Sequence, residues 1–335
     1  MGERPALSVV VPTRDRRELV LDELRALGRQ TLSPDSFEVV VVVDGATDGT
    51  AEALRALVPP FALTVLEQPG RGRAAACNAA IAASRGSVVV VLDDDMLPEP
   101  AMLEAHRAAH SGEGRLAVLG PVPIDIEPGV PAVTRYIGEK FNRHLEKLAA
   151  GSPIGIRDVY TGNFSIRRAL LDEVGPFDED FVVYGNEDGE LAARLLEAGV
   201  HFIYAREAVA RQRYTKSFRA LSRDNEAKGR TAVILARKHP HALSSLKLAA
   251  RSSVKLRLVR GVLLASGRRW PATSRLLIGG FDLLSRALPG VAVRAAPAAL
   301  DYFYWLGASA ELRRGGPIPA AAPTGAALPS GDLPA

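Results

Sequence analysis

Three consecutive carboxylates follow an apolar run and are the clearest candidates for chemistry in this sequence. The run SVVVVL (87–92) is typical of a buried strand, and Asp93, Asp94 and Asp95 come directly after it. Like charges this close repel one another and destabilise a fold unless a cation lies among them. Carboxylate oxygens suit Mg²⁺ or Mn²⁺. The alternative is that they cap a helix starting near residue 98, but a cap needs only one aspartate. We therefore favour a cation site.

A second acidic pair opens another predicted element. Glu187 and Asp188 begin the stretch NEDGELAARLLEAG (186–199), whose acidic first turn and terminal glycine predict a helix. Carboxylates in a first helical turn interact favourably with the helix dipole. A carboxylate can also act as a general base that accepts the proton of an attacking hydroxyl. The pair is therefore a candidate for catalysis as well as for helix stabilisation.

The elements that must position these side chains alternate between strand and helix over the first hundred residues. Apolar runs rich in β-branched residues lie at 7–12, 37–43, 61–66 and 87–92, and helix-like stretches lie at 16–30, 50–58 and 73–85. This alternation predicts an α/β fold with a mostly parallel sheet covered by helices on both faces. Such sheets bind ligands at the carboxyl ends of their strands. The polar residues at these ends are Thr13, Arg14 and Asp15, Asp44 to Asp48, and Asp93 to Asp95.

The middle of the chain breaks this alternation. Prolines between about 120 and 157, with a short predicted helix in 134–151, indicate a loop-rich excursion over a site. The stretch 161–181 then predicts a strand followed by a helix, and 201–205 predicts a further strand.

The last third of the chain differs in charge and pattern. The first 216 residues carry 24 basic and 32 acidic residues, whereas 217–335 carry 18 and 6. Helices are predicted in 217–240, 244–267 and 274–288, and the low-complexity stretch 315–335 is predicted to be disordered. No uninterrupted apolar stretch reaches the roughly 18–20 residues of a membrane span. We expect three parts: a domain over 1–216, a basic helical region over 217–314, and the tail.

Other residue types narrow the class of protein. Cys77 is the one cysteine, so an internal disulfide is excluded and an intracellular location is expected. The short apolar run near the N-terminus ends in proline and does not predict a signal peptide. The histidines show no metal-ligand spacing, and His106 and His110 are predicted to face solvent on a helix. The basic C-terminal part has little aromatic interleaving and no nucleic-acid-binding motif.

Three motifs in order resemble a family 2 glycosyltransferase with the GT-A fold, a Rossmann-like sheet that binds a nucleotide-diphospho-sugar. They are VVVPTRDR, VVVVDGATDGT, and GRGRAAACNAAIAASRGSVVVVLDDDMLPEP. The resemblance covers about 7–212, and the later residues match only as a variable helical appendage. It implies a nucleotide-sugar half over about 1–120 and an acceptor half over about 121–216.

The resemblance also implies roles for individual residues. The aspartate cluster matches the D-x-D motif of the family, with Asp95 and Asp93 as ligands of Mn²⁺ or Mg²⁺. Asp188 would be the general base of an inverting transfer, with Glu187 as its neighbour. The implied donor-binding residues are Pro12, Thr13, Arg14, Asp44, Arg73, Asp93, Asp94, Gly162 and Asn163. Among these, Asp44 would accept a hydrogen bond from the nucleobase, although a simple turn role is also open. Arg14 is equally compatible with a surface position.

One position departs from the pattern of the family. Many members have a histidine that helps to bind the metal ion shortly after the last strand, and this chain has Gln212 there. Only a neutral oxygen is available from glutamine. A non-catalytic nucleotide-sugar-binding or scaffold protein is therefore the alternative, although the Glu187–Asp188 pair argues against it. A nucleotidyltransferase is less favoured, because VPTRDRREL lacks the glycine-rich loop expected after the first strand.

The expectation is thus an enzyme, a hexosyltransferase-like glycosyltransferase of cell-envelope polysaccharide, glycolipid or related glycan synthesis. Its expected partners are a nucleotide-sugar donor and a glycan or lipid-linked acceptor, with no nucleic acid. The expected location is cytoplasmic. Basic helices with aromatic residues favour a peripheral position on the inner face of the plasma membrane, and an ordinary helical cover over the core is the alternative. The aromatic residues concerned are Trp270, Phe281, Tyr302, Phe303, Tyr304 and Trp305.

Overall fold

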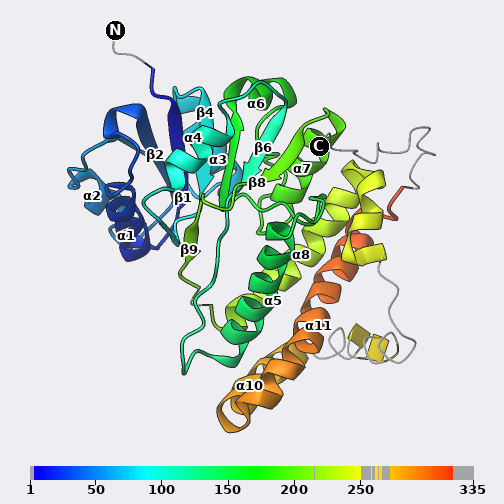
Figure 1. The fold of residues 1–335 in the computed structure, drawn as a ribbon. Coiled ribbons are helices and arrows are strands. Elements are labelled where there is room, and N and C mark those ends of the chain that lie inside the picture. Colours follow the sequence, from blue (N-terminus) through cyan, green and yellow to red (C-terminus); the bar gives the residue numbers. More distant parts are fainter. Residues whose placement is uncertain are drawn as a thin grey trace.

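A mixed sheet with seven strands organises the protein (Figure 1). The computed structural model describes residues 4–214, 216–249, 258, 261–262, 264–265 and 272–319. The strands are β1 (Leu7–Thr13), β2 (Phe37–Asp44), β3 (Ala62–Gln68), β4 (Val88–Leu92), β5 (Met96–Pro98), β6 (Leu116–Leu119), β7 (Asn163–Arg167), β8 (His201–Tyr204) and β9 (Ala210–Gln212). Their order in the large sheet is β3-β2-β1-β4-β7-β6-β8, and β5 pairs with β9 in a small second sheet.

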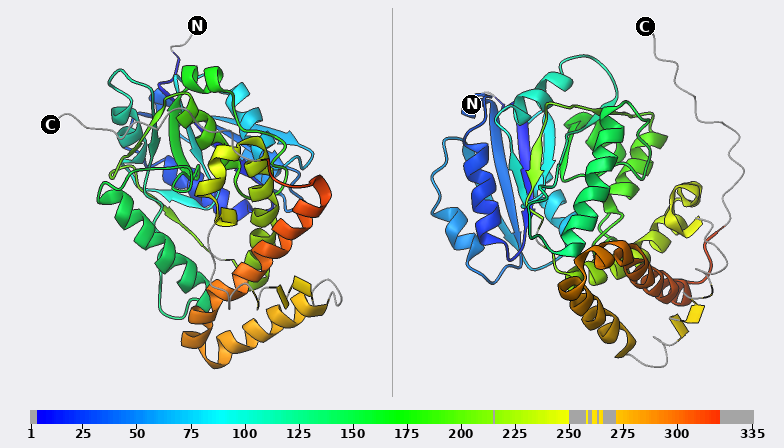
Figure 2. Two further views of the ribbon diagram at one scale, coloured as in Figure 1. Left: turned by 90° about the vertical axis from the view of Figure 1, so that its right-hand side faces the viewer. Right: turned by 60° about the horizontal axis from the view of Figure 1, so that its bottom comes forward.

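Helices cover both faces of the sheet and continue beyond it (Figures 1 and 2). The α-helices are α1 (Arg17–Leu27), α2 (Thr50–Arg55), α3 (Arg73–Ala83), α4 (Met102–Ala109), α5 (Ala132–Ala149), α6 (Arg168–Val174), α7 (Glu187–Glu197), α8 (Phe218–Lys238), α10 (Ala272–Ala287) and α11 (Pro289–Gly315). The 3₁₀ turns are η1 (Pro34–Ser36), η2 (Pro240–Ser245) and η3 (Lys247–Ala249).

The valine-rich runs form the centre of the sheet. In β1, β2 and β4 every residue is buried, as expected for strands covered on both faces. The pairs β1–β2, β1–β4 and β2–β3 are parallel, with Val9 opposite Val39 on one side and Val90 on the other. The predicted α/β fold with a mostly parallel sheet is therefore confirmed.

Two strands differ from the simple expectation. The strand β7 runs antiparallel to both of its neighbours, β4 and β6, so the sheet is mixed. The strand β3 lies at the edge of the sheet, and its residues alternate between exposed and half-buried. Its apolar run was expected to be buried on both faces, but an edge strand packs against fewer neighbours.

The strand order places a binding crevice at one point. The chain builds outward from β1 to β2 and β3, then crosses to the other side of β1 to form β4. Crevices at such a reversal lie outside the carboxyl ends of the two strands. The end of β1 is Thr13, and β4 ends one residue before Asp93. The polar residues selected from the sequence therefore meet at this reversal.

The C-terminal helices pack tightly on one another and on α5. A Cβ atom on Gly229 of α8 would lie 1.8 Å from the carbonyl oxygen of Tyr304 in α11, and one on Gly307 would lie 1.8 Å from that of Glu226. Only glycine permits so close a crossing. Phe218 of α8 stacks on Phe281 of α10 at a centroid distance of 3.7 Å. These helices share an apolar core with α5.

The predicted C-terminal helices are found in part. The helices expected at 217–240 and 274–288 correspond to α8 and α10, and α5 is a full helix of 18 residues where a short one was expected. Of the helix expected at 244–267, the structure describes 3₁₀ turns up to residue 249, and most of the remainder lies outside the described residues. So does the predicted tail beyond 319. Among the helices in the described part, none is both long and apolar enough to cross a membrane.

Candidate active site

The aspartate cluster lies at the crevice between β1 and β4. The hydroxyl of Thr13 donates to Asp94 Oδ2 at 2.8 Å, and Arg16 donates to Asp94 Oδ1 at 2.7 Å and to Asp95 Oδ2 at 3.2 Å. Burial raises the pKa of Asp94 to about 6, against the opposing effect of Arg16, and it also raises the pKa of Asp95. The residue that follows the cluster is Met96 of β5, not a helix. The alternative of a helix cap is therefore wrong.

Arg16 is the internal cation that the sequence reasoning missed. It lies at the entry to α1, and its side chain is 34% exposed. The sequence signal was present in TRDRR, because a basic residue shortly after β1 can reach the neighbouring strand end. The charge of the cluster is thus already balanced in part by the protein.

Gln212 also reaches this cluster. Its side-chain amide nitrogen lies 3.3 Å and 3.4 Å from the two carboxylate oxygens of Asp95. The pairing of β5 with β9 brings it there, because Met96 and Gln212 are partners in that small sheet. Gln212, which stands where many family members have a histidine, therefore lies beside the acidic cluster.

Arg73 joins the first acidic group to the second. At the start of α3, its guanidinium lies 2.6 Å from Asp93 Oδ1, 3.4 Å from Asp188 Oδ1 and 3.8 Å from Glu187 Oε1. Gly162 lies beside this contact, because a Cβ atom there would be 2.8 Å from Asp93 Oδ2. Carboxylates that are far apart in the sequence therefore share one arginine.

Glu187 and Asp188 are held by the backbone turn that starts α7. The preceding residue, Asn186, adopts a left-handed conformation with φ of 66° and donates its amide to the backbone oxygen of Lys228 in α8 at 3.0 Å. Gly185 N–H donates to Glu187 Oε2 at 2.8 Å, and the hydroxyl of Thr161 donates to Asp188. Burial, followed by the charge of Asp188, raises the pKa of Glu187 to about 7. The pair therefore combines a buried carboxyl with a more open carboxylate.

Asp44 holds the loop after β3. Its Oδ1 accepts from Gln68 Nε2 and from the backbone N–H of Arg71, both at 2.7 Å, and its Oδ2 accepts from Gly72 N–H at 2.9 Å. Asp44 Oδ2 thus retains capacity for a further donor. A turn role is visible for Asp44, and its role in nucleobase binding stays a prediction.

The other predicted donor-binding residues differ in their exposure to solvent. Pro12 is buried within β1, and Arg14 is exposed with its guanidinium beside Gly70. The side chain of Asn163 is fully buried and donates to the carbonyl oxygens of Pro121 and Ala208. Its position in the core leaves Gly162 as the part of this pair that borders the site.

The prediction for the two helical histidines is wrong. His106 is fully buried and His110 nearly so, and both rings hydrogen-bond to Ser165 of β7, at 2.8 Å and 2.9 Å. His106 also contacts Asn163 Oδ1 at 2.8 Å. Burial lowers the pKa of each histidine to about 4, so both are neutral at pH 7. They are polar core residues that connect α4 to the sheet.

Other histidines come together although no sequence spacing indicated it. One ligand atom each from Glu197, His239 and His241 lies within 4.8 Å of the others. His239 Nε2 lies 3.1 Å from Glu190, and His241 Nε2 lies 3.0 Å from Glu197. A hydrogen bond between His239 and Glu190 and the close contact of His241 with Glu197 account for the arrangement.

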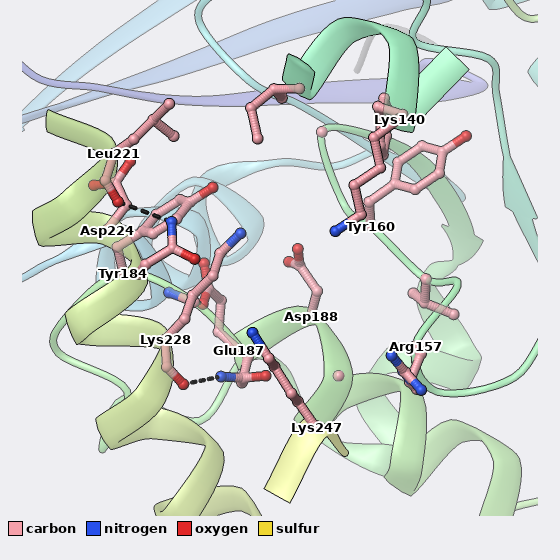
Figure 3. A pocket seen from close by; sticks show the side chains of 18 of the residues that line it. Lys140, Arg157, Tyr160, Tyr184, Glu187, Asp188, Leu221, Asp224, Lys228 and Lys247 are labelled. Carbon is pink, nitrogen blue, oxygen red and sulfur yellow. Dashed lines mark hydrogen bonds between the residues drawn. The ribbon is translucent and has the colours of Figure 1, made fainter. Parts of the chain in front are cut away.

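A cavity of about 510 Å³ connects the second acidic pair to the C-terminal helices (Figure 3). Its walls come from α5, the segment before β7, the start of α7, α8 and the turn η3. Arg73, Asp93, Gly162, Glu187 and Asp188 border it, as does Gln212. The remaining predicted residues, Pro12, Thr13, Arg14, Asp44, Asp94, Asp95 and Asn163, are outside its lining. One cavity thus joins the candidate base to one carboxylate of the strand-end cluster.

Comparison with known proteins identifies the family. The family described as glycosyl transferase family 2 matches residues 8–175, which is half of the chain. This protein belongs to glycosyltransferase family 2. A second family, described as the N-terminal domain of galactosyltransferase, matches residues 143–219. The resemblance inferred from the sequence motifs is therefore confirmed.

Curated relatives cover part of the chain. Validoxylamine A glucosyltransferase of Streptomyces hygroscopicus subsp. limoneus is 29% identical over 229 residues, covering 61% of this chain and 51% of the relative. Glycosyltransferase AglE of Haloferax volcanii is 29% identical over 208 residues, covering 61% and 66%. The chain thus spans between half and two thirds of the length of these relatives.

A solved structure shows the same fold over nearly the whole chain. It is the mannosyltransferase PcManGT of Pyrobaculum calidifontis, in complex with GDP-Man and Mn²⁺. The TM-score is 0.56 at 23% identity, with 93% of this chain and 86% of that chain covered. This likeness supports the GT-A fold.

Proposed function

We propose that this glycosyltransferase moves a sugar from a nucleotide-diphospho-sugar to an acceptor hydroxyl. The observation that carries the proposal is the single cavity in which Asp188 and Asp93 lie on either side of Arg73. A transferase needs a donor site and a base within reach of one reacting centre. The crevice between β1 and β4 supplies the first, and the start of α7 supplies the second.

In this proposal the donor lies across the ends of β1, β2 and β4. Asp44 faces the nucleobase, while Pro12, Thr13, Arg14 and Asp94 border the nucleotide, and Gly162 leaves room for the sugar. Arg73 is placed to stabilise negative charge on the donor, because it is a fixed guanidinium that already contacts two carboxylates of the site. Asn163 positions Gly162 from behind.

The cluster offers carboxylate oxygens, the ligands that a hard divalent ion prefers, and these oxygens now accept from Arg16, Arg73 and Gln212. Asp93 and Asp95 offer carboxylate oxygens, and the amide of Gln212 lies against Asp95. The mannosyltransferase of the same fold is in complex with Mn²⁺. When bound, Mn²⁺ or Mg²⁺ would stabilise the charge of the departing diphosphate. Asp93 and Asp95 would hold it, with Arg16 offsetting the remaining charge.

Asp188 is proposed as the general base. Its carboxylate borders the cavity, and Thr161 and Arg73 fix its orientation. A base that deprotonates the acceptor while the acceptor attacks the anomeric carbon gives inversion. Glu187 stays buried behind it, and its pKa, raised to about 7, leaves it partly protonated at neutral pH. A hexose donor and a role in envelope glycan or glycolipid synthesis belong to the same proposal.

In this proposal different segments of the chain form the donor side and the acceptor side of the site. Residues 1–120 would form the donor half and 121–216 the acceptor half, while the helical region 217–314 closes the acceptor side of the cavity. The contacts of α8 with the start of α7 support this role. We therefore propose that the basic helices complete the site, whether or not they also lie on an anionic membrane.

A binding experiment tests the donor side. The wild-type protein is titrated with UDP-, GDP- and dTDP-sugars in Mn²⁺, in Mg²⁺ and in EDTA, together with Asp95→Asn. We expect one nucleotide class to bind in the presence of a divalent ion and to bind much more weakly in EDTA and in the variant. Absence of binding by every nucleotide sugar under all three conditions would contradict the proposal. Binding without any turnover would favour the scaffold alternative.

A further inference from the structure

Basic side chains from four separate segments point into the cavity that contains Asp188 (Figure 3). Lys140 comes from α5, Arg157 from the segment before β7, Lys228 from α8 and Lys247 from η3. These segments are far apart in the sequence, so their convergence is a product of the fold. The charge of this cavity wall therefore needs an explanation.

The carboxylates near these cations are already engaged. Asp93 pairs with Arg73, and Asp224 pairs with Lys216 at 2.7 Å. Lys247 lies 2.6 Å from Asp301. Asp93, Glu187 and Asp188 thus share Arg73, whereas Asp224 has a partner of its own in Lys216.

Three of the four cations have no such partner in the part of the chain that the structure describes. Within the described residues, no carboxylate lies within ion-pair distance of Lys140, Arg157 or Lys228. The Nζ atom of Lys228 lies 5.1 Å from the centroid of the Tyr184 ring. The pKa of Lys140 is lowered by burial and then by Lys228, Lys247 and Arg157, which are all cations. This part of the cavity wall therefore carries three neighbouring cations that have no carboxylate within ion-pair distance among the described residues.

Such a cluster stabilises a bound anion. Like charges held close together destabilise the empty protein, and a ligand with several charged oxygens relieves this repulsion. A phosphate group fits because its oxygens point in several directions, as the three cations do, and lysine and arginine are both common phosphate ligands. A carboxylate offers only two oxygens in one plane.

We propose that Lys140, Arg157 and Lys228 bind a phosphate group carried by the acceptor. The proposal rests on the proposed function, since it assumes that the acceptor enters this cavity. It deepens that function by naming the acceptor class: a phosphorylated glycan or polyol, or a lipid phosphate. An acceptor held by its phosphate presents a neighbouring hydroxyl to Asp188 in the same cavity.

The first experiment uses inorganic phosphate as the probe. Its affinity is measured by calorimetry for the wild-type chain, for Lys140→Gln, and for the double variant Lys140→Gln/Lys228→Gln, with acetate at equal ionic strength as the comparison anion. We expect phosphate affinity to fall about tenfold for each cation removed. Lys147→Gln is the matched control, because Lys147 is exposed on the same helix and lies outside the cavity lining. Its phosphate affinity should equal that of the wild type.

A second titration separates the acceptor site from the donor site. Phosphate is added to protein already saturated with the nucleoside diphosphate that binds best. Retained phosphate binding supports an acceptor site, and loss of binding would assign the cations to the donor diphosphate and overturn the proposal. Equal phosphate affinity in the wild type and the double variant would also overturn it.

The source of the phosphate is found with vesicles. Phosphatidylcholine vesicles with and without a prenyl monophosphate are sedimented with the wild type and the double variant, and glycerol 3-phosphate is titrated in solution. Sedimentation that needs both the prenyl phosphate and the cations identifies a lipid acceptor. Binding of glycerol 3-phosphate alone identifies a soluble one. Failure of both ligands to bind would refute the phosphate site.

The outcomes for the two proposals remain distinct. If no nucleotide sugar binds but phosphate affinity depends on Lys140 and Lys228, the transferase function fails and the anion site stands. If a nucleotide sugar is bound and turned over while the cations have no effect on phosphate, the function stands and the acceptor class is wrong.

Discussion

The buried carboxyl of Glu187 gives a sharp prediction about stability and pH. The residue is 4% exposed, and burial together with Asp188 raises its pKa from 4.5 to about 7. Glu187→Gln keeps the shape and the oxygen that accepts from Gly185 N–H, but it removes the ionisable group. We expect this isosteric variant to change how the free energy of unfolding depends on pH.

The magnitude follows from the shift in pKa. Each pKa unit is worth 1.36 kcal/mol, so a rise from 4.5 to about 7 corresponds to roughly 3 kcal/mol. The folded state binds the proton more tightly than the unfolded state, so this stability is fully present below pH 4.5. It is lost as the pH rises from 4.5 through about 7, because the unfolded chain then releases this proton while the folded protein still holds it. The wild type should therefore lose roughly 3 kcal/mol over this range relative to Glu187→Gln.

Urea unfolding at several pH values between 4.5 and 8.5 measures this difference. The wild type and Glu187→Gln should be close in stability at the acidic end, and the variant should be the more stable protein above pH 7. Glu146→Gln is the control, since Glu146 is exposed on α5, and its profile should follow that of the wild type. Parallel profiles for the wild type and Glu187→Gln would refute the assignment of a raised pKa to Glu187.

Three further substitutions test the site and its supports. Arg73→Gln removes the cation that contacts Asp93, Glu187 and Asp188. We expect the free energy of unfolding in urea to fall by about 3 kcal/mol and turnover to be lost. Unchanged stability would contradict the role of Arg73 in joining these carboxylates. Gly162→Ala places a Cβ atom 2.8 Å from Asp93 Oδ2. We expect the free energy of unfolding to fall by about 1–3 kcal/mol and Mn²⁺ binding, measured by calorimetry, to weaken. An unaltered Mn²⁺ affinity would argue against this contact. Gly229→Ala places a Cβ atom 1.8 Å from the carbonyl oxygen of Tyr304. It should separate α11 from α8 and lower the free energy of unfolding by about 3 kcal/mol. Limited proteolysis should then cut the C-terminal helices faster, and an unchanged digestion rate would show that they do not pack as described.

The sheet and the acidic cluster could be predicted from the sequence because local patterns determine them. The valine runs at 7–12, 37–43 and 87–92 are buried on both faces, and this produces the unbroken apolar signal. The carboxyl ends of parallel strands share one edge of the sheet, so Thr13 and Asp94 had to lie near each other. Their hydrogen bond at 2.8 Å follows from this topology.

Side-chain partners across the fold could not be predicted in the same way. Arg16 and Arg73 are two of many arginines, and only the packing of α1 and α3 against the strand ends brings them to the carboxylates. His106 lies on a helix whose buried face includes a polar contact with Asn163, and helical spacing does not distinguish such a face from a solvent-exposed one. The burial of these histidines depends on β7, which is far away in the sequence.

The convergence of basic side chains in the cavity wall could not be predicted from the sequence either. Lys140 and Arg157 belong to the segment that was predicted as a loop-rich excursion over a site, and Lys228 belongs to the basic C-terminal region, but nothing in their spacing indicated that the three side chains converge. The close crossing of α8 and α11 occurs at Gly229 and Gly307, and residues of both helices line the cavity that contains Asp188. Long-range packing of this kind leaves no periodic signal.

The most direct test of the account compares donor turnover in the wild type and in Asp188→Asn. Release of nucleoside diphosphate is followed with the nucleotide sugar that binds the wild type, in the presence of Mn²⁺, and donor affinity is measured in parallel. We predict that Asp188→Asn binds the donor with wild-type affinity and turns it over at least about a hundredfold more slowly, because it cannot accept the proton of the attacking hydroxyl. Turnover by Asp188→Asn at the rate of the wild type would contradict the central claim that Asp188 is the base of a sugar transfer.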